Sequence, residues 1–271
     1  MSEILAPCGA MESLTAAVNA GADAVYLGEE YFSARKNADN FTAEQLCDAV
    51  RFCHYSGVKV YVTLNTLVFD REIPLLAKAI ENCAKADVDA FIVQDMGVAR
   101  LARQIVPELP LHASTQMTVN SPEGAIMAKE LGFTRVVLGR ELSFAQIKAI
   151  TESCDIETEL FVHGALCVCI SGQCYMSSVL GGRSGNRGLC AQPCRLDFTS
   201  GDRHNVLSLK DLSLTEKLPE LAKAGITSFK IEGRMKSPSY VYGVTKIYRR
   251  LLDENRSAEK AEIFELARLF S

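Results

Sequence analysis

Short runs of apolar residues alternate with amphipathic helical segments along almost the whole chain. The apolar runs have the length of buried strands and cover residues 4–6, 24–27, 58–64, 90–93, 111–113, 135–138, 158–162 and 228–231. The segments between them repeat apolar residues with the helical period and predict helices at residues 11–20, 43–56, 73–86, 122–131, 143–151, 214–224 and 239–252. The pattern predicts a repeated strand–helix unit.

The joints between helices and strands support this unit. Residues 20–28, 86–94, 131–139 and 224–233 share one pattern, in which a glycine or short polar residue ends a helix and an apolar strand follows. Thr42, Ser121 and Ser237 are typical helix-capping residues. Eight such units predict an α/β fold of the (β/α)8 TIM type, with a doubly wound open sheet as the alternative. The two folds share the local pattern, so the count of eight strands favours the barrel.

One long segment interrupts the repeat. Residues 165–212 separate the seventh strand from the seventh helix and are rich in glycine, serine, arginine and cysteine. They contain two strand-like pieces, at residues 195–199 and 206–209. We therefore predict one TIM-like barrel domain over residues 1–271, with a cysteine-rich insertion at about residues 165–212.

The composition agrees with one large core. A chain of 271 residues with 48% hydrophobic residues can bury such a core. The net charge of −4 provides no overall basic field of the kind that attracts nucleic acids. No apolar run approaches the roughly 20 residues of a membrane-spanning helix, and the first residues do not resemble a signal segment. We therefore expect a cytoplasmic protein with no membrane partner.

Cysteines crowd the inserted segment. Cys167, Cys174, Cys190 and Cys194 lie among glycines and arginines, and Cys169 lies between the first two. Thiolates held close together usually bind a soft metal or an iron–sulfur cluster, and nearby arginines lower the pKa of the thiols. A metal centre in a loop favours an enzyme.

Three other interpretations of these cysteines remain open. A disulfide pair is one, although thiols stay reduced in the cytosol. A structural zinc site is another, although zinc ligands usually come in closely spaced pairs and the gaps here are six, fifteen and three residues. Burial of free thiols is the third, and it suits Cys47, Cys53 and Cys83 on helical apolar faces better than cysteines in a polar loop.

Polar residues follow the predicted strands, at the ends where barrel enzymes carry their chemistry. His112 and His163 lie at the ends of the fifth and seventh strands. Lys230 and Glu232 alternate with apolar residues, which points both charges into the barrel lumen, where they pair or meet a ligand. We predict catalytic roles for His112, His163 and Glu232. The alternatives are ordinary loop polarity and histidines satisfied by backbone partners.

Several segments resemble a known family. The segment E-L-F-V-H-G-A-L-C-V-C-I-S-G-Q-C-Y-M-S, at residues 159–177, is similar to the signature of the collagenase-like peptidase family U-32. Further similar segments are A-P-C-G (6–9), Y-F-S-A-R (31–35), H-A-S-T-Q (112–116) and F-K-I-E-G-R-M-K-S (229–237). The resemblance covers about residues 3–252.

The resemblance implies a four-iron four-sulfur (4Fe-4S) cluster. By the signature, Cys167 and Cys174 are cluster ligands, and Cys190 and Cys194 occupy the positions of the paired later cysteines. Some relatives take a ligand from a cysteine just after Lys-Asp-Leu, where this chain has Ser213. A four-thiolate site here must then use Cys194 or, as the alternative, Cys169. The chain stops at residue 271, whereas many relatives continue into a β-rich segment, so it is a short member or a fragment.

The resemblance also implies a reaction. Better understood relatives take part in oxygen-independent hydroxylation of a wobble uridine in tRNA, a cytidine in ribosomal RNA or a ubiquinone precursor. The RNA-modifying branches depend on prephenate. The favoured hypothesis is an iron–sulfur enzyme that forms 5-hydroxyuridine in tRNA, with prephenate as co-substrate. A collagenase-like peptidase, with Cys8 and either His112 or His163 as a dyad, is the alternative. A cluster-binding subunit that works with a paralogous partner is the third.

Basic residues are dense near the cysteines in a chain that is acidic overall. We predict that they bind an anionic substrate, either RNA phosphate or a dicarboxylate donor, for which the arginine fork is well suited. The predicted binding residues are Arg35, Arg140, Arg183, Arg187, Arg195, Lys230, Arg234 and Lys236. A solvated loop is the alternative.

Overall fold

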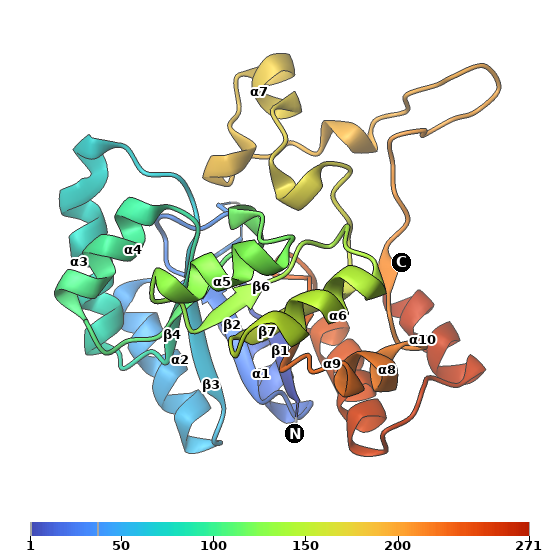
Figure 1. The fold of residues 1–271 in the computed structure, drawn as a ribbon, viewed down its shortest axis with the longest axis horizontal. Coiled ribbons are helices and arrows are strands. Elements are labelled where there is room, and N and C mark those ends of the chain that lie inside the picture. The colour runs from blue at the N-terminus through green and yellow to red at the C-terminus, as the bar shows by residue number, and fades with distance from the viewer. Residues whose placement is uncertain (1, 37, 271) are drawn as a thin grey trace.

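Eight parallel strands form a closed barrel surrounded by helices (Figure 1). The computed structural model describes all residues except 1, 37 and 271, and it leaves out the side chain of residue 270. The barrel strands are β1 (Glu3–Pro7), β2 (Ala24–Gly28), β3 (Lys59–Leu64), β4 (Ala90–Val93), β5 (Leu111–Ala113), β6 (Arg135–Val137), β7 (Glu157–Gly164) and β9 (Ser228–Ile231). The pairing of β9 with both β1 and β7, and of β6 with β7, closes the ring. The predicted (β/α)8 fold is confirmed.

Helices cover the outside of the barrel. They are α1 (Met11–Asn19), α2 (Ala43–Tyr55), α3 (Ile73–Lys85), α4 (Met96–Ile105), α5 (Pro122–Glu130), α6 (Phe144–Ser153), α8 (Leu218–Lys223) and α9 (Pro238–Asp253), with α10 (Lys260–Phe270) packed on α9. The predicted caps are confirmed, because the side chains of Thr42, Ser121 and Ser237 each accept a hydrogen bond from the first turn. Helices α4 and α10 were not predicted. In α4, Val98, Leu101, Ala102 and Ile105 do repeat with the helical period, so the sequence carried the signal for this helix.

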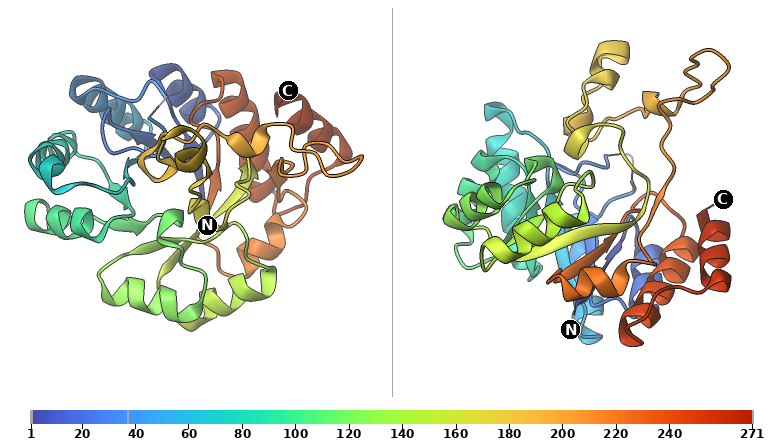
Figure 2. Two further views of the ribbon diagram at one scale, coloured as in Figure 1. Left: turned by 90° about the horizontal axis from the view of Figure 1, so that it is seen from above. Right: turned by 45° about the vertical axis from the view of Figure 1, so that its right-hand side comes forward.

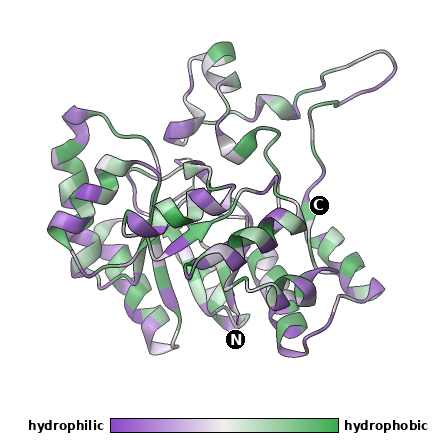
Figure 3. Ribbon diagram, in the orientation of Figure 1, coloured by the Kyte–Doolittle hydropathy of each residue, from purple (hydrophilic) through white to green (hydrophobic). Residues whose placement is uncertain are grey.

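Strand residues alternate between two apolar layers. One face of each strand packs under the helices and belongs to the main core, as Ile4 and Ala6 do in β1. The other face fills the lumen, where Leu5, Tyr26, Tyr61 and other side chains form a small cluster. Figure 3 shows that the outer helices carry both hydrophilic and hydrophobic residues. No helix within the described residues is long and apolar enough to cross a bilayer.

The cysteine-rich insertion follows β7 and lies above the carboxyl ends of the barrel strands (Figures 1 and 2). Its short elements are η3 (Ile170–Gly172), α7 (Met176–Gly181), η4 (Gly185–Arg187), η5 (Pro193–Arg195) and β8 (Leu212–Ser213). The strands predicted at residues 195–199 and 206–209 are wrong. These residues form a projecting loop joined by few backbone bonds, such as Val206 N to Phe198 O at 3.0 Å. This loop projects away from the barrel, and an isolated pair of extended segments with no sheet to join is only marginally stable as strands.

Contacts with three barrel loops hold the insertion in place. Arg187 donates to both carboxylate oxygens of Glu72, at 2.6 and 3.0 Å. The Ser171 hydroxyl donates to Glu141 at 2.7 Å. Gly188 has a φ of +78°, and a Cβ there would lie 2.5 Å from the carbonyl oxygen of Ser33, so only glycine allows this approach. The insertion is therefore fixed over the barrel mouth.

Candidate functional site

A cavity of about 460 Å³ lies between the barrel mouth and the insertion. This volume suits a small organic ligand. Its walls carry four cysteines, six basic residues and one carboxylate. These residues are Cys167, Cys174, Cys190, Cys194, Arg35, Arg140, Arg183, Arg195, Lys230, Arg234 and Glu232. The fold thus brings residues from both ends of the chain to the predicted cysteine cluster.

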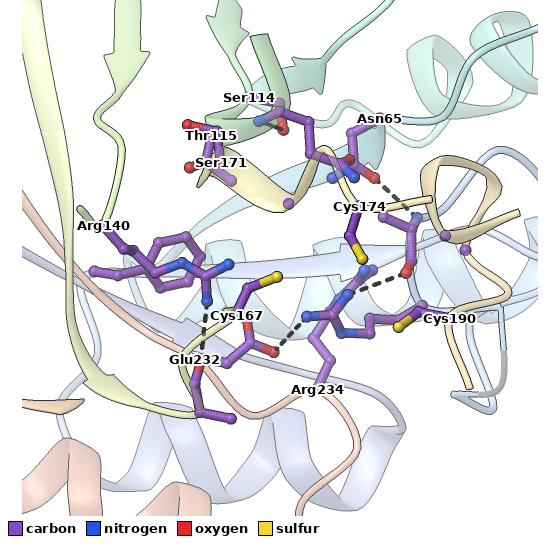
Figure 4. Close-up of a pocket in the computed structure, with 18 of the residues that line it drawn as sticks. Asn65, Ser114, Thr115, Arg140, Cys167, Ser171, Cys174, Cys190, Glu232 and Arg234 are labelled. Atoms are coloured by element: carbon purple, nitrogen blue, oxygen red, sulfur yellow. Dashed lines mark hydrogen bonds and ion pairs between the residues drawn. The ribbon is translucent and has the colours of Figure 1, made fainter. Parts of the chain in front are cut away.

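The four cavity cysteines are free thiols, which excludes the disulfide interpretation for the described structure. Burial raises the pKa of Cys194, Arg195 opposes that effect, and the charges of Cys167, Cys190 and Cys174 add to it. The thiol of Cys194 is therefore close enough to each of the other three cavity thiols for their charges to affect it. Figure 4 shows the sulfurs of Cys167 and Cys174 directed into the same space as the guanidinium of Arg234.

Two of these sulfurs accept backbone hydrogen bonds. Met176 N donates to Cys174 Sγ at 3.4 Å, and Gln192 N donates to Cys190 Sγ at 3.4 Å. The Ser177 hydroxyl lies 3.8 Å from Cys190 Sγ. Hydrogen bonds to sulfur favour thiolates and tune the potentials of iron–sulfur clusters. The donor set fits a group bound by thiolates, although no three His, Cys, Asp or Glu side chains among the described residues are placed to hold a single metal ion.

Cys169 differs from the other cysteines of the insertion. It lies outside the lining of the cavity, whereas Cys194 is part of it. Burial raises the pKa of Cys169, and the neighbouring thiols of Cys174 and Cys167 raise it further. Cys169 therefore lies near Cys167 and Cys174 without lining the cavity, whereas Cys194 lines it together with the other three thiols.

Arg234 forms a buried cationic part of the cavity wall. Its side chain is 5% exposed and donates to the hydroxyls of Ser33, at 2.7 Å, and Thr63, at 2.9 Å. Gly28 makes room for it, because a Cβ there would lie 2.9 Å from Arg234 Nη1. Burial lowers the pKa of Arg234 to about 10, so it remains charged at neutral pH. Among the described carboxylates none forms an ion pair with it.

Glu232 is the carboxylate in the cavity lining, and it forms an ion pair with Arg35 at 3.2 Å. Burial alone would raise the pKa of Glu232, but three guanidinium groups lower it below the ordinary value. They belong to Arg35, Arg140 and Arg234. Glu232 is therefore held as a carboxylate, which can accept a proton but has none to donate.

A network of charged side chains runs down the lumen from Lys230 in the cavity wall. Lys230 Nζ donates to Glu159 Oε1 at 2.6 Å, and Arg135 lies 3.4 Å from the other oxygen of Glu159. Arg135 also pairs with Glu3 at 2.6 Å and with Glu157 at 2.7 Å. The predicted lumen orientation of Lys230 is confirmed by this pairing. Two cations and three carboxylates thus share the lower barrel.

The two predicted catalytic histidines lie outside the cavity lining. His112 points into the lumen one layer below it, against the ring of Tyr61 at 4.8 Å between centroids. Burial, together with Arg135 and Lys230, lowers the pKa of His112 well below its ordinary value. A neutral, buried imidazole in edge-to-face contact with a tyrosine is a packing element of the barrel, so the structure offers no support for its catalytic role.

His163 faces away from the lumen. The register between β7 and β9 shifts between Phe161 and His163, and this bulge turns His163 toward α9. There His163 Nδ1 lies 3.3 Å from the hydroxyl of Tyr248, which itself donates to Val162 O. Burial lowers the pKa of His163 to about 4. The bulge is the reason that a strand-end histidine does not reach the cavity.

Of the remaining predicted basic residues, two line the cavity and two do not. Arg183 is exposed and lines the cavity. Arg195 lines it too, but donates to Ser208 and to the carbonyl of Leu166. Arg187, paired with Glu72, and Lys236, 5.5 Å from the ring of Tyr240, lie outside the lining. The last two therefore do not contribute to the cavity as predicted.

Several lining residues were not among the predicted site residues. They are Tyr26, Thr63, Asn65, Ser114, Thr115, Gln116, Phe161, Ser171 and Gln192. Thr63, Asn65, Ser114, Thr115 and Gln116 end or follow barrel strands, the position at which the sequence already indicated functional polar residues. Tyr26 and Phe161 could have been found by the alternation that places inward residues at every second position of a strand.

Comparison with known proteins identifies the family to which the chain belongs. The model for peptidase family U32 matches residues 9–270. The chain belongs to peptidase family U32. Its likeness to the solved structure of the U32 peptidase Mk0906, with a TM-score of 0.61 and 16% identity over 86% of this chain and 93% of that one, concerns the fold alone.

Curated members of family U32 carry different names. The chain is 44% identical over 259 residues to a 23S rRNA 5-hydroxycytidine synthase of Escherichia coli, covering 93% of this chain and 39% of that protein. It is 39% identical to the tRNA hydroxylation protein P1 of Bacillus subtilis, covering 93% and 63%. It is 37% identical to a collagenase of Porphyromonas gingivalis, covering 93% and 65%. The chain thus spans less than two thirds of these U32 relatives.

Proposed function

We propose that this chain is an iron–sulfur enzyme that hydroxylates RNA without molecular oxygen, with 5-hydroxyuridine in tRNA as its product and prephenate as co-substrate. The observation that carries the proposal is the cavity itself, in which four free thiols face a cationic wall. Two U32 relatives named for RNA hydroxylation support the reaction class. The alternative that the chain works together with a paralogous protein partner stays a prediction.

In this proposal the cluster would be held by Cys167, Cys174, Cys190 and Cys194. It would supply electron transfer, which side chains alone do not provide. The chain's own groups bind and orient the anionic co-substrate. Arg234 and Arg140 present guanidinium groups to the cavity, and Glu232 holds Arg35 in place. Paired guanidinium N–H groups suit carboxylates and phosphates equally.

The test is the modified nucleoside content of cells that lack their own RNA hydroxylases of this family. Expression of the chain without oxygen should raise 5-hydroxyuridine in tRNA, measured by mass spectrometry of nucleosides. 5-Hydroxycytidine in 23S rRNA is measured in the same samples, because one relative bears that name. A block in prephenate synthesis should abolish the gain. If neither nucleoside rises above the level of the empty strain, the proposed function is wrong.

The geometry gives less support to a peptidase, although one relative is named a collagenase. Cys8 is fully buried, and its pKa is raised by burial and by neighbouring Cys53. Cys8, His112 and His163 all lie outside the cavity lining. A protease dyad needs an accessible nucleophile activated by a base, and these three residues do not provide one.

Arg183 and Arg187 form a matched pair for testing RNA binding. Arg183→Ala should weaken binding of a tRNA anticodon stem-loop and reduce the slope of log affinity against log salt by about one, because one phosphate contact is lost. Arg187→Ala should leave the slope unchanged, since that guanidinium is paired with Glu72. Affinity is measured by fluorescence titration at several salt concentrations. Equal slopes in wild type and Arg183→Ala would remove Arg183 from the RNA site.

A further inference from the structure

Lys230 is a buried amine in the wall of the cavity. It lies on β9, is 3% exposed and belongs to the cavity lining. Its Nζ lies 4.3 Å from the ring centroid of Tyr26 and 5.2 Å from that of Phe161. Two aromatic rings and one carboxylate therefore hold the amine in a fixed place, unlike the mobile lysines of a protein surface.

A proton acceptor lies beside this amine. Glu159 Oε1 is 2.6 Å from Lys230 Nζ, and the Glu159 side chain is fully buried. Burial lowers the pKa of Lys230, and Glu159 only partly offsets this effect. Buried lysines with a lowered pKa give up a proton more readily than surface lysines and serve as nucleophiles toward carbonyl groups.

The cavity wall also selects the charge of a ligand. Arg234 donates to two hydroxyl groups, and Arg140 donates to the carbonyl oxygen of Ala165 at 3.0 Å. Among the described residues, no carboxylate forms an ion pair with either guanidinium. Two guanidinium groups that no carboxylate of the described chain neutralises favour a ligand that carries a carboxylate. A ligand that satisfies both the arginines and the amine would carry a carboxylate and a carbonyl group.

We propose that Lys230 forms a reversible imine with the carbonyl group of a 2-oxo acid bound in this cavity. The ammonium of Lys230 first passes a proton to Glu159. The neutral Nζ then attacks the carbonyl carbon, the carbonyl oxygen leaves as water, and a carbon–nitrogen double bond remains. No electrons are gained or lost, so the step needs no oxidant or reductant. It deepens the proposed function, in which the same arginines bind prephenate, itself a 2-oxo acid, but the imine step needs neither RNA nor a cluster.

The test is reductive trapping with pyruvate as the probe. Protein without RNA is incubated with pyruvate and sodium cyanoborohydride, which reduces an imine to a stable amine, and is then digested for peptide mass spectrometry. The expected result is one carboxyethyl group on Lys230, with about tenfold higher occupancy than on any other lysine, because a desolvated amine with a lowered pKa is neutral more often than a surface amine and so attacks carbonyl groups faster. The other lysines of the same sample, including exposed Lys36, serve as internal controls.

Two comparisons sharpen the result. Acetone has the carbonyl group without the carboxylate, and it should label Lys230 about tenfold less than pyruvate if the arginines select the ligand. Lys230→Arg keeps the positive charge beside Glu159 and should lose the label at this position. Absence of the label on Lys230 in the wild type, or equal labelling of all lysines, overturns the proposal. Equal labelling by acetone and pyruvate overturns the choice of a 2-oxo acid. Because the assay omits RNA, its outcome is separate from that of the hydroxylation test.

Discussion

Replacing any one of the four cavity cysteines by serine is expected to remove most of the iron from protein prepared without oxygen. The wild type should be brown and contain about four irons and four sulfides per chain, since such clusters are held by four thiolates. The four variants are Cys167→Ser, Cys174→Ser, Cys190→Ser and Cys194→Ser. Iron and acid-labile sulfide analysis, together with visible absorbance, measures the effect. RNA hydroxylation in cells should fall to background in each variant.

Two other serine variants serve as controls. Cys47→Ser changes a half-buried thiol of α2, away from the cavity, and should leave the iron content unchanged. Cys169→Ser tests the alternative fourth ligand, and it too should keep the iron, because Cys169 lies outside the cavity lining. Loss of iron from Cys169→Ser with retention in Cys194→Ser would reverse the assignment. A colourless wild type with one tightly bound zinc would end the cluster hypothesis.

Glu159→Ala is expected to lower the free energy of unfolding far more than removal of an exposed carboxylate of the same network. The carboxylate of Glu159 is fully buried and pairs with Lys230 at 2.6 Å and with Arg135 at 3.4 Å. Its removal leaves Lys230 without its carboxylate partner and takes one of three carboxylates from Arg135. Breaking a buried pair by removing one partner costs about 3–5 kcal/mol. The free energy of unfolding, measured by denaturant titration, should fall by about that amount.

Glu157→Ala is the matched control for this loss. Glu157 pairs with the same guanidinium of Arg135, at 2.7 Å, but its side chain is 52% exposed. Exposed ion pairs contribute about 0–1 kcal/mol, so this variant should lose less than about 1 kcal/mol. The difference between the two variants measures the effect of burial on one shared partner. Equal losses would show that the lumen network is not a buried charge cluster.

The sequence by itself determined the barrel. Apolar runs of strand length and helical repeats are local signals, because a side chain's direction depends on its own backbone period. Counting eight such units was enough to choose the closed barrel over the open sheet. The same alternation placed Lys230 in the lumen, and local capping patterns identified helix starts such as Thr42 and Ser237. The closely spaced cysteines indicated a thiol-rich site before any contact was known.

Only the tertiary structure decided which residues meet in the cavity. A single bulge in β7 turned His163 outward, and no local sequence signal revealed it. Arg183 and Arg187 are four positions apart, yet the first lines the cavity and the second pairs with Glu72 from a distant loop. The predicted strand pieces of the insertion remained a loop because no neighbouring sheet edge was present to pair with them. Such outcomes depend on contacts between segments far apart in the chain, whereas periodicity reports only on neighbours along it.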